Sequence, residues 1–307
     1  MHVEHPRTHG YKLRALINNS NLPQVDRPRV HAAIERYDEW RSRLKGPGLT
    51  GHEYLRELVR ALNEYKNYID LELIFDSQEN FLYRQNGQTK LSNSILEEFL
   101  PYLFDVRLVP GFQRLEDVIC GPQSSFSGLT FDSPFLPLSS GGVQLKTKDH
   151  DFSVAKVHRM TISNEPENGA TFSTRFSVSH FATEIKTNLD KTMFQEAAQT
   201  ANELKRAVPG ARYVLLCEYL DMTPITTKLT SIDEVIVLRR TKRLASNVRS
   251  NFSTAQGRQR ARQAYKNFLY DNPLHLGCFE RFLHHLNECF PEEGEDDADT
   301  VLTRGYF

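Results

Sequence analysis

Two long runs of strand-forming residues, followed directly by a helical pattern, constrain the fold more than any other feature of the chain. The runs DFSVAKVHRMTI (151–162) and ATFSTRFSVSHFATEIKT (170–187) are joined by a polar stretch in which Asn168-Gly169 is a favourable hairpin turn. A helix is predicted from about Lys191 to Ala207. Two apolar runs of the buried-strand type follow, RYVLLCEYL (212–220) and EVIVLR (234–239). This order predicts an α/β core with a mixed sheet.

Helical patterns dominate the N-terminal third of the chain. Residues 28–45 place apolar side chains at helical spacing and stop at Gly46-Pro47-Gly48, and a second helix is predicted from Thr50. A third is predicted over 93–104, whereas the Ser-, Gly- and Pro-rich segment 120–143 predicts loops around a short strand. We therefore expect a helical N-terminal region (1–90), an α/β core (91–245), a basic helical region (246–290) and an acidic tail (291–307).

The net charge of −1 hides a basic block and an acidic tail. Nine Lys or Arg residues and no Asp or Glu lie between Arg239 and Lys266, whereas residues 292–299 contain six acids and are predicted to be disordered. The basic block is typical of a surface that grips the DNA backbone, although a solvated helical face is the alternative explanation. The predicted DNA-binding residues are Arg239, Arg240, Lys242, Arg243, Arg249, Arg258, Arg260 and Arg262.

Several other classes of protein are disfavoured. The chain lacks a run of about 18 apolar residues that would span a membrane, and its polar N-terminus does not resemble a secretion signal. Its four cysteines show no CxxC spacing and are predicted to be reduced thiols. There is no phosphate-cradling glycine motif, which disfavours a nucleotide-driven enzyme. We expect a cytoplasmic bacterial protein.

One predicted strand carries a carboxylate and an ammonium side by side. Alternation puts Glu184 and Lys186 on one face of the strand. Such a pair is costly to bury without partners, which predicts a polar cleft. If Asn168-Gly169 forms a two-residue turn, Ser153 lies opposite Glu184 and Asp151 lies opposite Lys186. Asp151 and Glu184 would then be diagonal neighbours on the same face of the sheet.

Two acids and one lysine at this spacing suit the hydrolysis of a phosphodiester. The carboxylates of Asp151 and Glu184, with the backbone carbonyl of Ile185, offer the hard oxygen ligands that Mg²⁺ prefers. A bound Mg²⁺ lowers the pKa of its water and neutralises charge on the phosphate. Lys186 is then expected to hold the attacking water and to stabilise the anionic transition state. The predicted catalytic residues are Asp151, Glu184 and Lys186.

The stretch DHDFSVAK…ATEIKTNLDKTMFQEAAQTANELKRAVPGARYVLLCEYLDMTPI resembles the PD-(D/E)xK nuclease superfamily. More narrowly, it is similar to the heterodimeric type II restriction endonucleases of the BbvCI type, over about residues 90–245. The superfamily Asp matches Asp151, and its (D/E)xK matches Glu184 and Lys186, with His150 where a Pro often stands. The resemblance implies a mixed β-sheet nuclease core flanked by helices. It also implies Mg²⁺-dependent cleavage of double-stranded DNA at a short asymmetric site, 5′-phosphate ends, and a second, non-identical subunit.

Alternatives are open for several site residues. Asp149 or Asp132 could replace Asp151 as the first acid. The resemblance also suggests Glu97 or Glu98 as an auxiliary metal ligand, although an exposed helix face explains both, and Asp190 is best explained as an N-cap. Glu218 and Asp221 could approach the cleft, but such acids usually cap or solvate strand ends. A zinc-like cluster is better explained as the packing of an amphipathic helix; it comprises His275, Cys278, His284, His285 and Cys289.

Two other functions compete with a restriction endonuclease. One is a repair, resolving or transposition nuclease of the same superfamily, which would share the site but recognise DNA structure or a partner protein. The other is a DNA-binding subunit without cleavage of its own, in which Glu184 and Lys186 are only a surface ion pair. The complete set of two acids and a lysine disfavours this last function.

Overall fold

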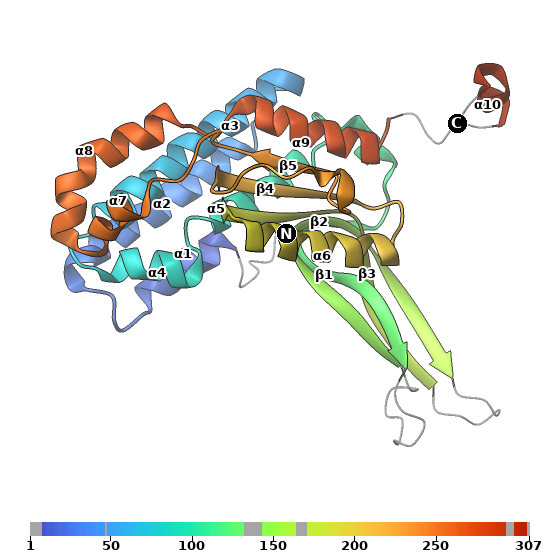
Figure 1. Cartoon of the computed structure of the whole chain (residues 1–307), viewed down its shortest axis with the longest axis horizontal. Coiled ribbons are helices and arrows are strands. Elements are labelled where there is room, and N and C mark those ends of the chain that lie inside the picture. The colour runs from blue at the N-terminus through green and yellow to red at the C-terminus, as the bar shows by residue number, and fades with distance from the viewer. Residues whose placement is uncertain (1–7, 47, 132–142, 164–170, 293–297, 306–307) are drawn as a thin grey trace.

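The computed structural model describes residues 8–46, 48–131, 143–163, 171–292 and 298–305. A five-stranded sheet lies between helices on its two faces, and a bundle of helices covers one end of the sheet (Figure 1). The predicted α/β architecture with a mixed sheet and a helical N-terminal region is confirmed. None of the helices that the structure describes is long and apolar enough to cross a membrane.

The N-terminal helices form where apolar residues recur every three or four positions. In α2 this stripe includes Val30, Tyr37 and Trp40, and Pro28 occupies the first turn, where a missing backbone N–H costs nothing. A π-helix, Tyr68–Phe75, continues α3 directly and was not predicted, because a widened turn has no distinct sequence signal. The helices of this part are α1 (His9–Ile17), α2 (Arg27–Leu44), α3 (Gly51–Asn67), α4 (Phe81–Thr89) and α5 (Ser94–Phe99).

The sheet has the order β1-β2-β3-β4-β5, antiparallel from β1 to β3 and parallel from β3 to β5. Its first three strands are long and extend beyond the body of the protein as an arm (Figure 1). The prediction of loops around a short strand in 120–143 is wrong for residues up to 131, since a 14-residue strand with two register shifts runs there. The strands are β1 (Val118–Phe131), β2 (Val143–Ser163), β3 (Thr171–Leu189), β4 (Arg212–Leu220) and β5 (Glu234–Val237).

The predicted register between β2 and β3 is wrong by two residues at the site. Ser153 pairs with Ala182 rather than Glu184, and Phe152 pairs with Thr183. The predicted turn at 168–169 lies outside the described residues, but the ladder begins at Ser163↔Thr171, and a bulge between Val154 and Ala155 then shifts it by one residue. Side chains alternate with a period of two, so the error of two residues leaves Asp151 and Glu184 on the predicted common face.

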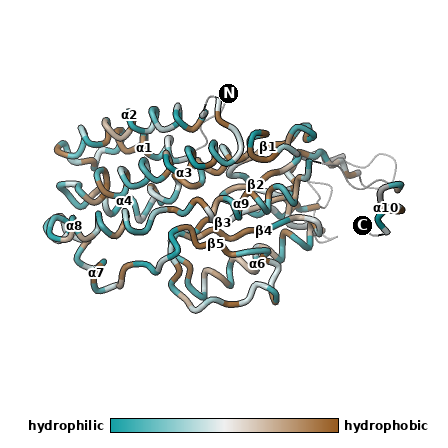
Figure 2. Tube along the Cα trace, turned by 90° about the horizontal axis from the view of Figure 1, so that it is seen from above, coloured by the Kyte–Doolittle hydropathy of each residue, from teal (hydrophilic) through white to brown (hydrophobic). Residues whose placement is uncertain are grey.

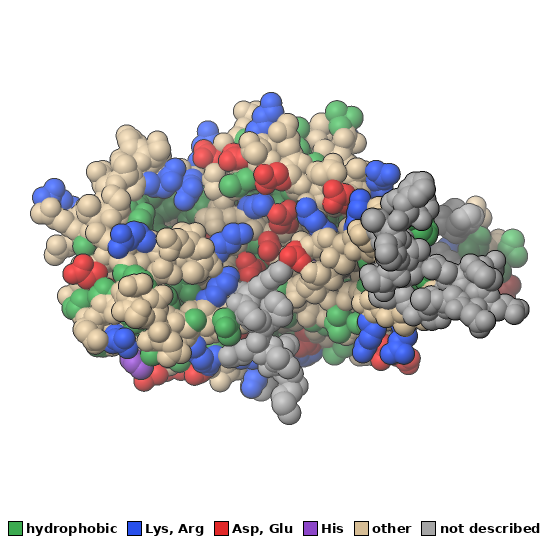
Figure 3. All heavy atoms as spheres, turned by 90° about the horizontal axis from the view of Figure 1, so that it is seen from below, with side chains coloured by type: hydrophobic (Ala, Val, Ile, Leu, Met, Phe, Trp, Pro, Cys, Tyr) green, Lys and Arg blue, Asp and Glu red, His purple; other side chains and the backbone are tan. Residues whose placement is uncertain are grey.

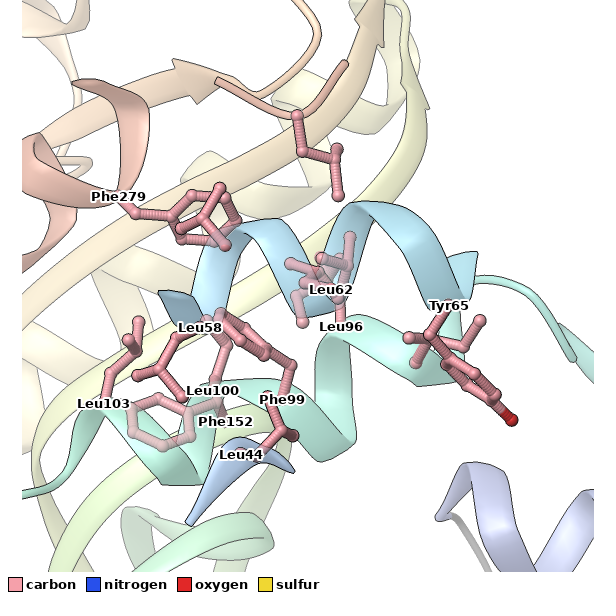
Figure 4. Close-up of a cluster of buried hydrophobic side chains, with 14 of the residues drawn as sticks. Leu44, Leu58, Leu62, Tyr65, Leu96, Phe99, Leu100, Leu103, Phe152 and Phe279 are labelled. Carbon is pink, nitrogen blue, oxygen red and sulfur yellow. The ribbon is translucent and has the colours of Figure 1, made fainter. Parts of the chain in front are cut away.

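Two hydrophobic clusters cover the two faces of the sheet. On one face, Phe152 of β2 packs with Phe99 and Leu103 of the N-terminal helices and with Phe279 of α9 (Figure 4). On the other, α6 (Lys191–Ala207) covers Ala182 and Tyr213. Hydrophobic residues gather along the inward side of these elements in Figure 2. Burying each large apolar side chain contributes about 1.5–3 kcal/mol, so the central strands are fixed from both sides.

The C-terminal helices pack back onto the N-terminal part of the chain. Helix α8 (Ala255–Asp271) contacts the π-helix through Leu269 and Phe252, which share a cluster with Leu71 and Phe75. Helix α9 (Leu276–Cys289) covers the sheet, α7 (Ser246–Ser250) is short, and α10 (Ala298–Arg304) lies within the acidic tail. The predicted disorder of the tail is wrong for 298–304, which is helical, and residues 293–297 lie outside the described part of the chain.

Candidate active site

The structure brings Asp151, Glu184 and Lys186 together where β2 passes β3. Beyond the pair Phe152↔Thr183, Asp151 Oδ2 accepts a 2.7 Å hydrogen bond from the Ile185 amide. Lys186 Nζ lies 2.6 Å from Glu184 Oε1, and the two side chains are only 18% and 23% exposed. The Asp151 carboxylate of β2 is therefore hydrogen-bonded to the backbone of β3 between Glu184 and Lys186.

Tyr213 holds the second oxygen of Glu184. Its hydroxyl donates to Glu184 Oε2 at 2.8 Å from β4, which runs parallel to β3. Burial, with the charge of Glu184, raises the pKa of Tyr213 well above its usual value, so the phenol stays a donor at working pH. Sequence reasoning missed this residue; its signal was a phenol near the start of a mostly apolar buried strand, which also carries Tyr219 and Glu218.

His150 adds a buried neutral ring beside this pair. Burial lowers the pKa of His150 to about 4, and the ring lies 6.3 Å from that of Tyr213. Its Nδ1 is buried and has no hydrogen-bond partner among the residues the structure describes. Buried polar atoms are nearly always paired, so this atom is one that water or a ligand shell would complete.

The surroundings of Asp151 disfavour its negative charge. Burial raises the pKa of Asp151, and the nearby charge of Glu184 raises it further, whereas the Ile185 amide, Lys90 and Lys186 lower it. The charge of Glu184 therefore disfavours the charge of Asp151. A cation placed between them would relieve both burial and repulsion.

The N-terminal helices support β3 from behind. Asn93 donates to the Ile185 carbonyl at 3.4 Å and accepts from Thr187 Oγ1 at 3.2 Å. This residue was also missed, because no local pattern relates a helix N-cap to a strand 92 positions later. The contact fixes the backbone between Glu184 and Lys186, which defines the direction of both side chains.

The donor set fits a hard divalent cation. In the described part of the chain, no group of three or more His, Cys, Asp and Glu side chains forms a metal site. Mg²⁺ does not need one, because it is commonly held by one or two carboxylates and keeps several waters and substrate phosphates. Asp151, Glu184 and the second lone pair of the Ile185 carbonyl provide such ligands. The site therefore fits Mg²⁺ better than zinc.

The competing acids lie in other settings. Asp149 is exposed and accepts from Ser124 on β1, whereas Asp132 lies outside the described residues. The expected exposed face for Glu97 and Glu98 is wrong: Glu97 is buried, and Glu98 accepts from Gly10 N at 2.9 Å and from a tyrosine hydroxyl. Neither contact of Glu98 leads to Asp151.

Three other predicted features are structural. Asp190 is the N-cap of α6 and accepts from Met193 N at 2.9 Å, as predicted. Asp221, at the end of β4, accepts from Asn188 at 3.3 Å. The zinc-like cluster belongs to the region of α9. There His285 Nε2 lies 2.6 Å from the Glu234 carboxylate and does not join the cysteines. These findings agree with packing rather than metal binding.

The basic block divides into buried and accessible cations. Arg239 and Arg258 are each only 1% exposed, so the prediction that they contact DNA is wrong. Arg239 is paired with Glu218 at 3.0 Å, and Arg258 donates to backbone carbonyls that include Phe75 O at 2.9 Å. The exposed or partly exposed members are Arg240, Lys242, Arg243, Arg249, Arg260 and Arg262. Figure 3 shows Lys and Arg side chains around a central group of acidic ones on one face of the molecule.

The chain combines a mixed sheet with a helix directly after the strand that carries Glu184 and Lys186, and with a parallel strand beside that strand. Residues 88–307 match the family described as Bpu10I restriction endonuclease, so the chain belongs to that family of DNA nucleases. The chain is also similar to a solved structure described as a native BbvCI A2B2 tetramer, with 20% identity and a TM-score of 0.62. The likeness covers 93% of this chain and 97% of that one, so the shared fold includes the helical N-terminal region. A comparison with curated proteins finds no match.

Proposed function

We propose that this chain is one subunit of a type II restriction endonuclease. It would hydrolyse phosphodiester bonds in double-stranded DNA at a short asymmetric site, with Mg²⁺, and leave 5′-phosphate ends. The observation that carries the proposal is that the side chains of Asp151, Glu184 and Lys186 lie together. Asp151 accepts from the Ile185 amide, and Glu184 is held between Lys186 and Tyr213. Membership of the Bpu10I family supports DNA as the substrate.

Each residue has a defined part in this mechanism. Asp151, Glu184 and the Ile185 carbonyl would hold Mg²⁺, which would supply positive charge at the phosphate and lower the pKa of a water at the site. Lys186 orients the attacking water and offsets the charge that develops on the phosphate oxygens. Tyr213 keeps the Glu184 carboxylate in one orientation, and the neutral His150 adds no competing charge beside it.

A second, non-identical subunit belongs to the proposal. The similar solved structure is described as an A2B2 assembly, and one catalytic centre in this chain would cut one strand of the duplex. In this scheme the core (91–245) cuts, and the exposed cations between 240 and 262 hold the DNA backbone. One hydrophobic cluster joins the N-terminal helices to the sheet and α9, which supports a scaffolding part for region 1–90.

The test is incubation of the purified protein with plasmid DNA and Mg²⁺, alone and with the product of a neighbouring gene. Nicks at one sequence by this chain alone, and discrete fragments with the partner, are the expected results. Cuts that follow DNA structure instead of sequence would identify a repair or resolving nuclease. Gel shifts without any cut would identify a subunit that only binds.

A further inference from the structure

A cavity of about 370 Å³ adjoins the strand that carries the catalytic pair. Its lining joins three parts of the chain that are distant in sequence. Lys90 and Asn93 come from the N-terminal helices, Thr187 follows Lys186 on β3, and Arg243 and Arg249 come from the segment between β5 and α8. Asn93 bonds both Thr187 and the Ile185 carbonyl, so one wall of the cavity is also the support of the catalytic strand.

Three cations of the lining are unmatched by acids. Among the residues the structure describes, no carboxylate forms an ion pair with Lys90, Arg243 or Arg249, although Arg249 Nε donates to the Leu244 carbonyl at 2.8 Å. Burial lowers the pKa of Arg243 and the charge of Arg249 lowers it further, whereas the charge of Asp221, which forms no ion pair with Arg243, raises it. Two like charges held together in a partly enclosed place disfavour each other, so a bound anion would stabilise them.

The two acids in the lining are already neutralised. Lys66 Nζ lies 3.2 Å from Asp70 and 3.0 Å from Glu218, and Arg239 lies 3.0 Å from Glu218 and 3.8 Å from Asp70. This quartet is buried and contains two charges of each sign. The positive charge of Lys90, Arg243 and Arg249 is therefore not cancelled from within the cavity.

Phenol groups complete the lining with further donors. Tyr83, Tyr219 and Tyr265 line the cavity. Burial raises the pKa of all three, so each hydroxyl keeps its proton. Within the described structure, three cations without ion-pair partners and three neutral phenols, beside acids that are already paired, match an anion with several oxygens, as a phosphate is.

Lys90 links this cavity to the catalytic centre. It lines the cavity together with Asn93, whose side-chain amide donates to the Ile185 carbonyl between Glu184 and Lys186. Lys90 also has a left-handed backbone, φ 54°, at the end of α4. Such conformations are strained for a residue with a side chain and concentrate at functional sites.

We propose that this cavity binds a non-scissile phosphate of the DNA, and that Lys90, Arg243 and Arg249 thereby position the strand over Asp151 and Glu184. The proposal rests on the proposed nuclease function and adds a second anchoring point for the substrate. Arg243 and Arg249 then differ from the rest of the exposed basic block, because they act through one defined phosphate rather than through a diffuse field.

The experiment is a chemical double-mutant cycle with the full chain in EDTA, so that DNA is bound and not cut. The probe is the tightest-binding duplex selected from a random-sequence pool, with single phosphates replaced one at a time by neutral methylphosphonates. Arg243→Gln is compared with wild type and with Arg260→Gln, a matched loss of one exposed charge outside the cavity lining. Arg243→Lys and thermal melts identify any loss due to misfolding, since Lys keeps the charge.

We expect one methylphosphonate to weaken wild-type binding about tenfold and Arg243→Gln to do the same, with no further loss when the two are combined. The losses of affinity caused by Arg260→Gln and by that methylphosphonate should instead multiply. If the loss of affinity caused by Arg243→Gln multiplies with the loss caused by every methylphosphonate, the proposed subsite is wrong. The nuclease function would still stand if the wild type cuts plasmid DNA. A parallel titration with inorganic phosphate distinguishes a DNA phosphate from a free one. If Arg243→Gln abolishes binding of inorganic phosphate while its loss of DNA affinity multiplies with that of every methylphosphonate, the cavity binds a free phosphate. That result would contradict the DNA proposal.

Discussion

The Tyr213 hydroxyl donates to Glu184 Oε2 across neighbouring parallel strands, at 2.8 Å, while Lys186 occupies Glu184 Oε1 at 2.6 Å. Glu184 is thus fixed at both oxygens before any substrate or metal arrives. A carboxylate that is already oriented loses little conformational freedom on binding a cation, which is the advantage of a preorganised site.

Tyr213→Phe tests this relationship. Losing the hydroxyl removes one hydrogen bond to a charged acceptor, and we expect a loss of about 1–3 kcal/mol in the free energy of unfolding. Single-turnover cleavage should fall about tenfold, with unchanged DNA affinity. Tyr270→Phe, at a residue 60% exposed, is the control and should change neither quantity. Cleavage at the wild-type rate in Tyr213→Phe would mean that Glu184 is oriented by Lys186 alone.

Asp151→Asn tests the cost of the buried carboxylate. Because the pKa of Asp151 is raised in the folded state, its protonation favours folding, so stability is present at low pH and is lost as pH rises through the raised pKa. Asn keeps an acceptor for the Ile185 amide but carries no charge. We expect a melting temperature about 2 °C higher than wild type at pH 8 without metal, with the difference shrinking towards pH 4. A variant that melts below wild type at pH 8 would contradict this account.

Lys66→Met tests the buried charge quartet at the floor of the cavity. The substitution leaves Arg239 as the remaining cation beside Asp70 and Glu218, and we expect a loss of about 3–5 kcal/mol in unfolding free energy. The control is Arg60→Ala, which breaks an exposed pair with Glu57 and should cost about 0–1 kcal/mol. Equal effects in urea denaturation would show that burial of the quartet does not increase its importance.

Arg258→Ala and Arg260→Ala separate the structural and the DNA-facing members of the basic block. Arg258 donates to the carbonyls of Phe75, Ser77 and Glu79, which ties α8 to the end of the π-helix, so its loss should cost about 3 kcal/mol of stability. Arg260 is exposed, and its loss should leave stability within about 0.5 kcal/mol. For Arg260→Ala we expect the slope of log affinity against log salt to fall by about one. A stable Arg258→Ala protein with weakened DNA binding would reverse these assignments.

Local patterns account for most of the fold. Helix α6 spans 191–207 and β4 spans 212–220, as periodicity and the buried apolar run predict. The long β1 was missed because Ser, Gly and Pro within it are loop signals, and the bulges that accommodate them are decided by pairing with β2. Register was likewise beyond local reasoning, since a bulge after Val154 depends on packing rather than on its own sequence.

The site was predictable only where its members lie close along the chain. Alternation alone places Glu184 beside Lys186, and the structure brings Asp151 to the same place through the corrected register. Tyr213 and Asn93 join the site through contacts between distant segments, which no spacing rule contains. Burial also decides that Arg239 supports the core instead of facing DNA, and charge counting cannot separate these two cases.

The most direct test of the central claim is single-turnover cleavage of plasmid DNA by Lys186→Ala, in Mg²⁺, with any partner subunit at saturating concentration. The account predicts a rate at least about 100- to 1,000-fold below wild type, an unchanged melting temperature within about 2 °C, and nearly unchanged DNA affinity in EDTA. Glu184→Ala should behave in the same way. Cleavage by Lys186→Ala at the wild-type rate, in a reaction that EDTA stops, would contradict the account, because Asp151, Glu184 and Lys186 would then not form the hydrolytic centre.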